Sequence, residues 1–482
     1  MAEKVVLVNP SQMKPAVAPI ALDYLAHALI EHHFQVDVLD LCFSLDWTQD
    51  IDRYFASNSV IAIGVTLRNT DDTSFANQEF FIPKFKEIID YIRRQTSAPV
   101  ILGGSGFSVM PEAILDYCGL DLGISGDGER SLPLLVSKLV SNQDYRFTPG
   151  LVYRSREGFR CNPPAYIDLD KMPSPRRTAV DNRRYFVEGG MGNIETKRGC
   201  NKGCIYCADP LGKGRSIRLR SPDSVVNEME SLLKVGIDYF HFCDSEFNLP
   251  PSHAEQVCLE IIHRGLGDKV NWYAYASPVP FTEEMAALFR RSGCRGTNFG
   301  ADSGHDRMLR ILGRDFRVDD LRRTAAICHQ QGLVFMYDLL LGGPGETRET
   351  LQQTVGVMKE LSPLRVGAAL GVRIFPGTEL SNIVRTMGPL HNNPSLQGSV
   401  DGNEQFFAPI FYLSAALGED AQQYLADLIG EDERFFFMSP PEAGGRNYNY
   451  NENTLLVEAI RRGYKGAFWD ILRRLAEGGE LG

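Results

Sequence analysis

The sequence predicts an α/β protein made of two successive blocks of alternating strands and helices, followed by a smaller and mostly helical C-terminal part. In both blocks, short apolar runs typical of buried strands alternate with segments whose apolar residues recur at helical spacing. This alternation favours parallel strands whose sheet is covered by helices on both faces. The composition, 43% apolar and 23% charged residues, is that of a folded globular protein and excludes wholesale disorder.

The first block, residues 1–145, is expected to form a doubly wound, Rossmann-like parallel sheet. Its strands are predicted at 4–9, 34–41, 60–67, 99–104 and 122–125, with helices at 18–33, 82–96 and 132–140. Ligands of such sheets bind at the carboxyl ends of the strands. The loops in that position are 9–15, 68–72, 103–108 and 126–130.

Residues 146–190 lose this alternation, contain five prolines and two arginine pairs, and are predicted to be a linker. The second block, residues 191–385, is expected to be a partial or full β/α barrel, with its chemistry at the C-terminal strand ends. Its strands are predicted at 193–196, 239–244, 270–276, 296–301, 334–341 and 365–374. Residues 386–482 are irregular and then helical, and their aromatic clusters, with 446–450, either cap the barrel or belong to a plain packing module.

Three of the ten cysteines fall within eight residues, directly after the first strand of the second block. Cys200, Cys204 and Cys207 have the spacing C-x3-C-x2-C. Three thiolates on one short loop hold three corners of a cuboidal iron–sulfur cluster and leave a fourth iron open for a substrate. A structural zinc site needs four ligands, usually in paired knuckles. Because the sequence has no histidine or second cysteine pair near this loop, zinc and unrelated core cysteines are the weaker alternatives.

This spacing, with Tyr206 just before the third cysteine, resembles the signature of the radical S-adenosylmethionine (SAM) superfamily. Four further segments resemble later strands of that family's barrel: HFCDSEFN at 241–248, FGADSG at 299–304, LLGGPGET at 340–347 and RIFPGTEL at 373–380. The second of these departs from the usual pattern, because Asp302 replaces a glutamate. The resemblance implies a partial (β/α)6 radical SAM barrel that holds a [4Fe-4S] cluster and SAM.

The same resemblance implies roles for individual residues. Cys200, Cys204 and Cys207 would be the cluster ligands. Six further residues lie where the family contacts SAM: Asp244 and Glu246 at the methionine end, Asp302 and Ser303 at the ribose or carboxylate, Arg314 at the carboxylate, and Gly343 in the turn beside adenine. The alternative for each of these is a satisfied core or capping residue. The cluster would receive its electron from a donor such as flavodoxin or ferredoxin.

The first block resembles the cobalamin (B12)-binding domain of B12-dependent radical SAM enzymes. The carrying features are the first strand and the turns GGSG at 103–106 and GDGE at 126–129, whose small residues let a large macrocycle approach the backbone. The residues expected at cobalamin are Asn9, Arg68, Gly103, Gly104, Ser105, Gly126, Gly128 and Glu129. The motif D-x-H-x-x-G, which supplies a lower-face histidine in many B12 proteins, is absent from the sequence, so cobalamin binding stays open at this point.

Arg68 occupies the loop where a lower-face residue would lie, which resembles the tryptophan 2-methyltransferase branch of the family. A cation there would disfavour a lower axial ligand and favour loss of the methyl group from cobalt as a cation, so we expect Arg68 to be catalytic. The alternative is an ion pair with Asp71 or Asp72.

Together these features imply a methyltransferase that moves a methyl group from SAM through methylcobalamin to a carbon of a small or peptide-derived substrate. Two alternatives remain: radical SAM chemistry other than methyl transfer (cyclisation, rearrangement or 3-amino-3-carboxypropyl transfer), with or without cobalamin, and a non-catalytic cobalamin or iron–sulfur sensor. Nucleic acid is disfavoured as a partner, since 61 acidic against 50 basic residues give a net charge of −11. No uninterrupted apolar run is long enough for a membrane span, and the N-terminus lacks a signal-peptide layout, so we expect a cytoplasmic protein in an oxygen-poor environment.

Overall fold

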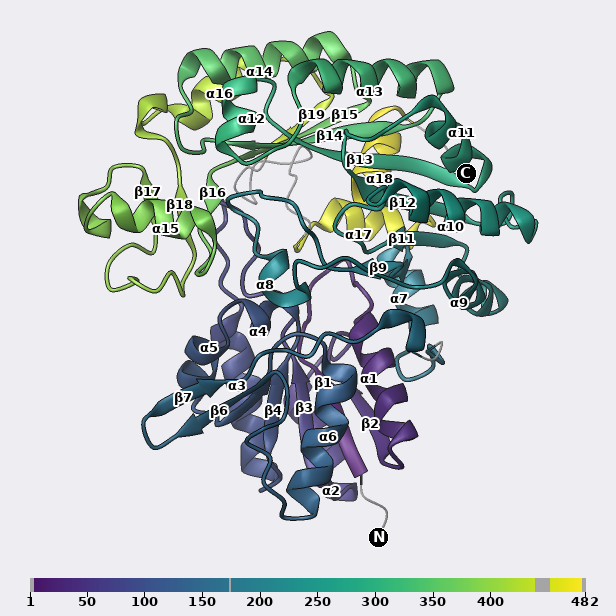
Figure 1. The fold of residues 1–482 in the computed structure, drawn as a ribbon, viewed down its shortest axis with the longest axis vertical. Helices are drawn as coiled ribbons and strands as arrows, with labels where there is room; N and C mark the ends of the chain where they lie inside the picture. The colour runs from purple at the N-terminus through teal and green to yellow at the C-terminus, as the bar shows by residue number, and fades with distance from the viewer. Residues whose placement is uncertain (1–3, 173–174, 438–450, 479–482) are drawn as a thin grey trace.

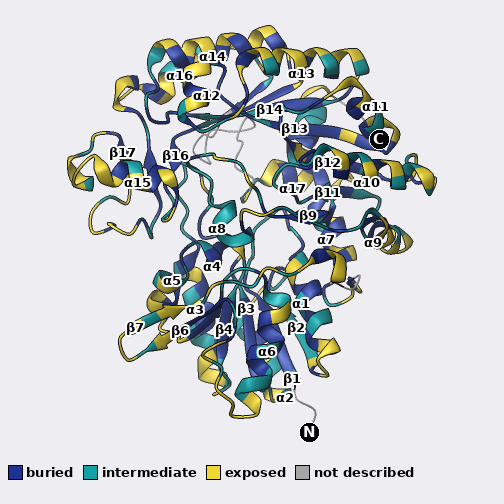
Figure 2. Ribbon diagram, in the orientation of Figure 1, coloured by how far each residue is buried: buried dark blue, intermediate teal, exposed yellow. Residues whose placement is uncertain are grey.

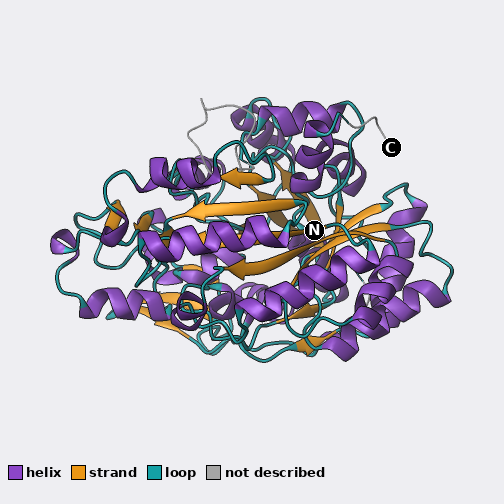
Figure 3. Ribbon diagram, turned by 90° about the horizontal axis from the view of Figure 1, so that it is seen from above, coloured by secondary structure: helices purple, strands orange, loops and turns teal. Residues whose placement is uncertain are grey.

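A computed structural model describes residues 4–172, 175–437 and 451–478. They form two units, each built around its own sheet, with the N-terminal unit below the second unit in Figure 1. The central strands of the two large sheets are mostly buried and the outer helices expose one face, as Figure 2 shows. Seen from above, helices flank the strands on both sides (Figure 3). None of the helices in these ranges is long and apolar enough to cross a membrane.

The N-terminal sheet has the strand order β2-β1-β3-β4-β5-β6-β7. Its first five strands are parallel: β1 (Lys4–Asn9), β2 (Gln35–Asp40), β3 (Ala62–Thr66), β4 (Val100–Gly103) and β5 (Leu122–Ile124). The helices are α1 (Ile20–Glu31), α2 (Trp47–Ser57), α3 (Ile82–Gln95), α4 (Ser105–Val109), α5 (Pro111–Cys118) and α6 (Gly128–Val140). Successive residues of β1 face opposite sides, so that Val6 packs with α3 and Leu7 with α1 and α6. Both faces are covered, which confirms the doubly wound sheet.

Part of the segment expected to be a linker extends this sheet. The hairpin β6 (Leu151–Ser155) and β7 (Gly158–Cys161) adds two antiparallel strands beside β5. The chain then crosses to the second unit through η1 (Leu169–Lys171) and α7 (Asn182–Gly189). The apolar stretch of β6 is short and follows a proline and a glycine, so its sequence pattern is weak.

The second sheet has the order β19-β15-β14-β13-β12-β11-β8, with all strands parallel. The six expected strands are β8 (Gly192–Ile194), β11 (Tyr239–Phe242), β12 (Asn271–Ala276), β13 (Cys294–Asp302), β14 (Phe335–Leu341) and β15 (Arg365–Leu370). The outer helices are α9 (Pro222–Lys234), α10 (Pro251–His263), α11 (Glu283–Arg291), α13 (Val318–Gln331) and α14 (Arg348–Leu361). Shorter elements at the carboxyl ends are β9 (Lys197–Arg198), α8 (Asp209–Lys213), β10 (Arg218–Leu219) and α12 (Asp306–Ile311). Among the described strands the two edges, β8 and β19, do not pair, so the barrel is open, as predicted.

The C-terminal segment belongs partly to this barrel. Its strand β19 (Phe435–Phe437) is the seventh strand of the sheet, a role that the sequence did not predict. The other elements are β16 (Val372–Arg373), α15 (Glu379–Thr386), η2 (Leu390–Asn392), β17 (Leu396–Gly398), β18 (Ile410–Tyr412), η3 (Ala415–Leu417), α16 (Ala421–Ile429), α17 (Thr454–Arg461) and α18 (Phe468–Ala476). Side chains of α17 and α18 pack against Tyr273 and Met336 on the inner face of the sheet. Residues 446–450 lie outside the described residues.

Candidate functional site

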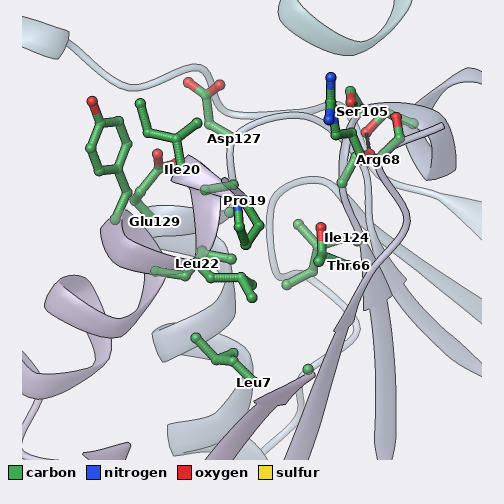
Figure 4. Close-up of a pocket in the computed structure, with 18 of the residues that line it drawn as sticks. Leu7, Pro19, Ile20, Leu22, Thr66, Arg68, Ser105, Ile124, Asp127 and Glu129 are labelled. Carbon is green, nitrogen blue, oxygen red and sulfur yellow. Dashed lines mark hydrogen bonds between the residues drawn. The ribbon is translucent and has the colours of Figure 1, made fainter. Parts of the chain in front are cut away.

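A cavity of about 360 Å³ lies between the two units, at the carboxyl ends of the N-terminal strands. Asn9, Thr66 and Ile124 line it from the sheet side, whereas Glu195 and Cys243 line it from the barrel side. In Figure 4, Arg68 and Ser105 lie together on one side of the cavity, opposite Asp127 and Glu129. The cavity therefore lies at the carboxyl ends of the parallel strands, where ligands of such sheets are expected to bind.

All eight residues expected at cobalamin line this cavity: Asn9, Arg68, Gly103, Gly104, Ser105, Gly126, Gly128 and Glu129. Gly104 shows why the turn needs glycine, since its φ is +105° and a Cβ there would lie 2.6 Å from the carbonyl oxygen of Leu67. The next residue, Ser105, donates from its hydroxyl to the Arg68 carbonyl at 2.8 Å. This turn thus fixes the loop that carries Arg68.

Arg68 has no side-chain hydrogen bond or ion pair with any described residue, and it is accessible from the cavity. The alternative ion pairs are wrong. Asp71 instead forms a buried pair with Arg373 of the second unit at 3.0 Å, and Asp72 accepts from Asn77 at 2.6 Å. The cavity walls withdraw water from the guanidinium and so lower the pKa of Arg68.

Besides Ser105, two of the eight residues have side chains that are already bonded within the protein. Asn9 donates to Asp40 and to Tyr185, each at 2.9 Å, and so belongs to the framework beneath the cavity. Glu129 accepts from Arg198 at 2.6 Å. Arg198 also bonds to Glu195 at 2.8 Å, so it ties the cavity turn to the segment just before the cysteine loop.

The three clustered cysteines lie on the loop between β9 and α8. Backbone bonds shape it: the Cys200 amide donates to the Gly214 carbonyl at 3.1 Å, and the Cys207 amide to the Cys204 carbonyl at 3.3 Å. No group of three or more His, Cys, Asp or Glu side chains in the described ranges is arranged to hold a metal ion. A single zinc needs its ligands converged at about 2.3 Å for sulfur, whereas each thiolate of an iron–sulfur cluster binds its own iron.

Arg314 joins several of the residues expected at the cluster and SAM. Its Nη1 donates to Cys204 Sγ at 3.0 Å, and its Nη2 donates to Glu246 Oε1 at 3.2 Å. Its Nε lies 3.5 Å from Asp302 Oδ2, and Tyr206 donates its hydroxyl to the same oxygen at 2.5 Å. Burial raises the pKa of Cys204, and the neighbouring guanidinium opposes that shift. Among the described residues, Glu246 Oε2 and Arg314 Nε are buried without a hydrogen-bond partner, so this group retains unused polar atoms.

Other expected SAM residues are placed differently. Asp244 is buried and accepts from the amide and hydroxyl of Thr196, at 2.9 and 2.5 Å, which fixes the loop after β8. Ser303 Oγ turns to Thr354 Oγ1 at 3.1 Å, toward α14. Gly343 lies beside Leu312, and a Cβ added to Gly343 would come within 3.0 Å of that side chain.

The sequence reasoning missed an inward-facing polar group in the barrel: His241, Tyr275, Asn298 and Asp338. Cys243, two residues after His241, reaches the cavity between the units. The available signal was the alternation within each strand. In β12, for example, Trp272, Ala274 and Ala276 join the outer core, which leaves Tyr275 on the inner face.

Two family models match the chain. The B12 binding domain matches residues 11–136, and the radical SAM superfamily matches residues 194–358. These ranges coincide with the unit that lines the cavity from below and with the barrel that carries the cysteine loop.

Full-length similarities agree. The chain is 33% identical to the tryptophan 2-C-methyltransferase of Streptomyces laurentii, over 96% of this chain and 95% of that protein. It superposes on the radical SAM methyltransferase TsrM from Kitasatospora setae, solved with tryptophan substrate and the SAM analogue aza-SAM, with a TM-score of 0.93, 33% identity and coverage of 99% and 98%. A second TsrM structure, with cobalamin and a [4Fe-4S] cluster, gives a TM-score of 0.89 at 32% identity, again covering 99% of this chain and 98% of that one. The resemblance stated from the motifs is confirmed: the chain belongs to the cobalamin-dependent radical SAM methyltransferases.

Proposed function

We propose that this enzyme methylates tryptophan at carbon 2, with SAM as the methyl source and cobalamin as the carrier. The relatives named above supply the substrate and the position. The observation that carries the proposal is Arg68, an arginine with no ionic partner among the described residues, in the wall of a cavity shared by the two units.

The cavity fits cobalamin on this chain's own residues. The positive φ of Gly104, and the lack of room for a Cβ there, leave backbone rather than side chains at the sheet edge. Gly128 supports the same reading, because a Cβ on it would lie 2.8 Å from Leu25 Cδ2. Small residues at these turns let a planar macrocycle approach the strands.

Arg68 would be one of the residues that contact the bound cofactor. Bound cobalamin supplies a cobalt centre that accepts a methyl group and passes it to carbon. A guanidinium has five N–H donors and no acceptor, so it cannot ligate a metal. Arg68 would therefore place a positive charge beside the bound cofactor without ligating its metal.

Cys200, Cys204 and Cys207 would hold a [4Fe-4S] cluster whose fourth iron takes SAM. Arg314 orients Cys204 and keeps Glu246 and Asp302 beside it. Of the residues expected at SAM, we assign direct contact to these three, and Glu246 Oε2 and Arg314 Nε support this because they have no hydrogen-bond partner among the described residues. Asp244 and Ser303 are assigned to positioning, because their polar atoms are engaged within the protein.

The test is anaerobic reconstitution with iron, sulfide, cobalamin and SAM, followed by incubation with tryptophan. We expect S-adenosylhomocysteine and one mono-methylated tryptophan per turnover, identified by mass spectrometry. Formation of 5′-deoxyadenosine without S-adenosylhomocysteine would establish the non-methyl alternative. A protein that binds its cofactors but yields neither product would be a sensor, and either result would overturn the proposal.

A further inference from the structure

The inner face of the barrel is divided into layers along β13. Gly296 lies against the ring of Trp469 in α18, and a Cβ added to Gly296 would come within 2.8 Å of that ring. Helix α18 therefore closes the inside of the barrel at the end where β13 begins. Two residues further on, Asn298 occupies the middle of the barrel. Two residues beyond that, the Gly300 carbonyl accepts from Arg314 Nη2 at 2.7 Å, within the group expected at the cluster and SAM. The Asn298 layer therefore lies between the helical plug and the cofactor residues.

Asn298 and its neighbour Asp338 form a polar pair in this layer. Asn298 Nδ2 donates to Asp338 Oδ2 at 2.6 Å. Since an ionised carboxylate only accepts, this bond fixes the orientation of the amide and leaves Oδ1 as an acceptor. Asn298 is 3% exposed, and no described residue donates to its Oδ1. A buried acceptor without a donor is unfavourable, so a donor is expected from a bound molecule.

The surroundings of the pair suit an aromatic molecule. Tyr275 is in register with Asn298 on the next strand, and 39% of it remains exposed although it faces the concave side of the sheet. The His241 ring packs edge-on against it, with centroids 5.2 Å apart. From His241, the inner face of β11 leads to Cys243, which lines the cofactor cavity. A ring against Tyr275 would thus lie between the amide pair and the cofactors.

We propose that Asn298 and Asp338 form the subsite that binds the protonated amino group of the substrate. An ammonium group has three donors and no acceptor, which matches one amide oxygen and one carboxylate. The exposed face of Tyr275 adds attraction for a cation. Desolvation lowers the pKa of His241 to about 4, and the positive charge of Arg68 acts in the same direction, so this ring is neutral at pH 7 and adds no cation of its own. The inference rests on the proposed amino-acid substrate and adds to it the group by which that substrate is held.

The test compares tryptophan with indole-3-propanoate, which lacks only the amino group, on the reconstituted holoenzyme. Binding is measured by calorimetry and methylation by kcat/KM. A site built to bond a donor rejects an analogue that lacks it, so we expect the wild-type enzyme to prefer tryptophan by about 100-fold or more. In Asp338→Asn and Asn298→Ala, this ratio should fall to within a few-fold of unity, because tryptophan loses affinity and indole-3-propanoate does not.

Thr297→Val is the matched control, since Thr297 is the buried neighbour on the same strand and contacts Cys294 on the opposite face. It should keep the wild-type ratio. Equal binding of the two ligands to wild type would overturn the subsite while leaving tryptophan methylation intact, and this comparison needs no variant to fold. If the holoenzyme neither binds nor methylates tryptophan, the proposed substrate fails and the subsite falls with it. If either variant binds neither tryptophan nor indole-3-propanoate while its cofactor absorbance is unchanged, the Asn298–Asp338 pair has a structural role, and the proposed subsite is also overturned.

Discussion

At the scale of single residues, the site contrasts an arginine with several protein partners with an arginine that has none among the described residues. Arg314 bonds to a thiol, a carboxylate and a backbone carbonyl. Arg68 faces the cavity without a partner among the described residues, although Asp71 lies three positions away and is paired elsewhere. A charge held without a partner in a partly desolvated site is unfavourable unless a ligand uses it.

We expect Arg68→Ala to retain cobalamin and lose methyl transfer. Removal of the guanidinium admits water to this part of the cavity and removes the positive charge, so the methylation rate should fall at least about 100-fold, the usual scale for losing one preorganised charge. The visible spectrum of bound cobalamin should change as well. Asn69→Ala, in the same loop, is the control and should alter neither. Normal turnover of Arg68→Ala would remove Arg68 from the mechanism.

We expect Cys204→Ala to abolish the brown iron–sulfur absorbance after anaerobic reconstitution. One missing thiolate leaves one iron of the cube without its ligand. Cys161→Ala tests whether cysteine loss in general is responsible, because Cys161 is an exposed thiol on β7. Iron and sulfide content, measured with the spectrum, should fall only in the first variant. An intact cluster in Cys204→Ala would refute the assignment of this ligand.

At the scale of elements, the turn after β4 carries a steric requirement that the hairpin turn before β7 does not. Gly104 and Gly158 both have positive φ, +105° and +117°. A Cβ on Gly104 would lie 2.6 Å from the Leu67 carbonyl oxygen, whereas on Gly158 it would meet nothing within 4 Å. Comparing substitutions at these two glycines therefore distinguishes the cost of a positive φ from the cost of a steric clash beside the cavity.

Gly104→Ala should destabilise the protein more than Gly158→Ala and should also weaken cobalamin binding. The control carries only the conformational cost of positive φ, about 1–2 kcal/mol. Gly104→Ala adds a displacement of the segment that ends in Arg68. Urea unfolding gives the stability difference, and titration followed by visible absorbance gives the affinity. Equal effects of the two variants on both quantities would show that the turn does not shape the cavity.

The elements show how far sequence reasoning reaches. The main parallel strands follow from apolar runs between helical segments, because buried strands carry that pattern along their whole length. The strand β19 was not predicted because three consecutive phenylalanines after a helix show neither the alternation of a half-buried strand nor the spacing of a helix. At the site, motifs located the cysteines and the cavity turns. The inward group around Asn298 was missed, since it is assembled from neighbouring strands and only their register brings it together.

At the scale of the whole molecule, a buried charge network joins the two units. Arg177, from the connecting segment, bonds to Asp23 of α1 at 2.9 Å and to Glu228 of α9 at 2.6 Å. Glu228 also pairs with Arg220 at 2.7 Å. The four side chains are at most 2% exposed, and their charges cancel. Since the cavity takes its walls from both units, this network holds those walls at a fixed distance.

Arg177→Met should therefore affect both stability and the cofactor cavity. It removes the cation between two buried carboxylates, and breaking a buried pair by deleting one partner costs about 3–5 kcal/mol. Arg146→Met is the control, because Arg146 and Asp144 form an exposed pair at 2.8 Å, and such pairs contribute little to stability. Anaerobic urea unfolding should show a much lower midpoint for Arg177→Met alone, and cobalamin affinity should drop with it. If Arg177→Met unfolds at the same urea concentration as Arg146→Met, the network does not hold the two units together. If stability falls but cobalamin still binds normally, the cavity walls are held by other contacts, with the buried Asp71–Arg373 pair between the units as the next to test.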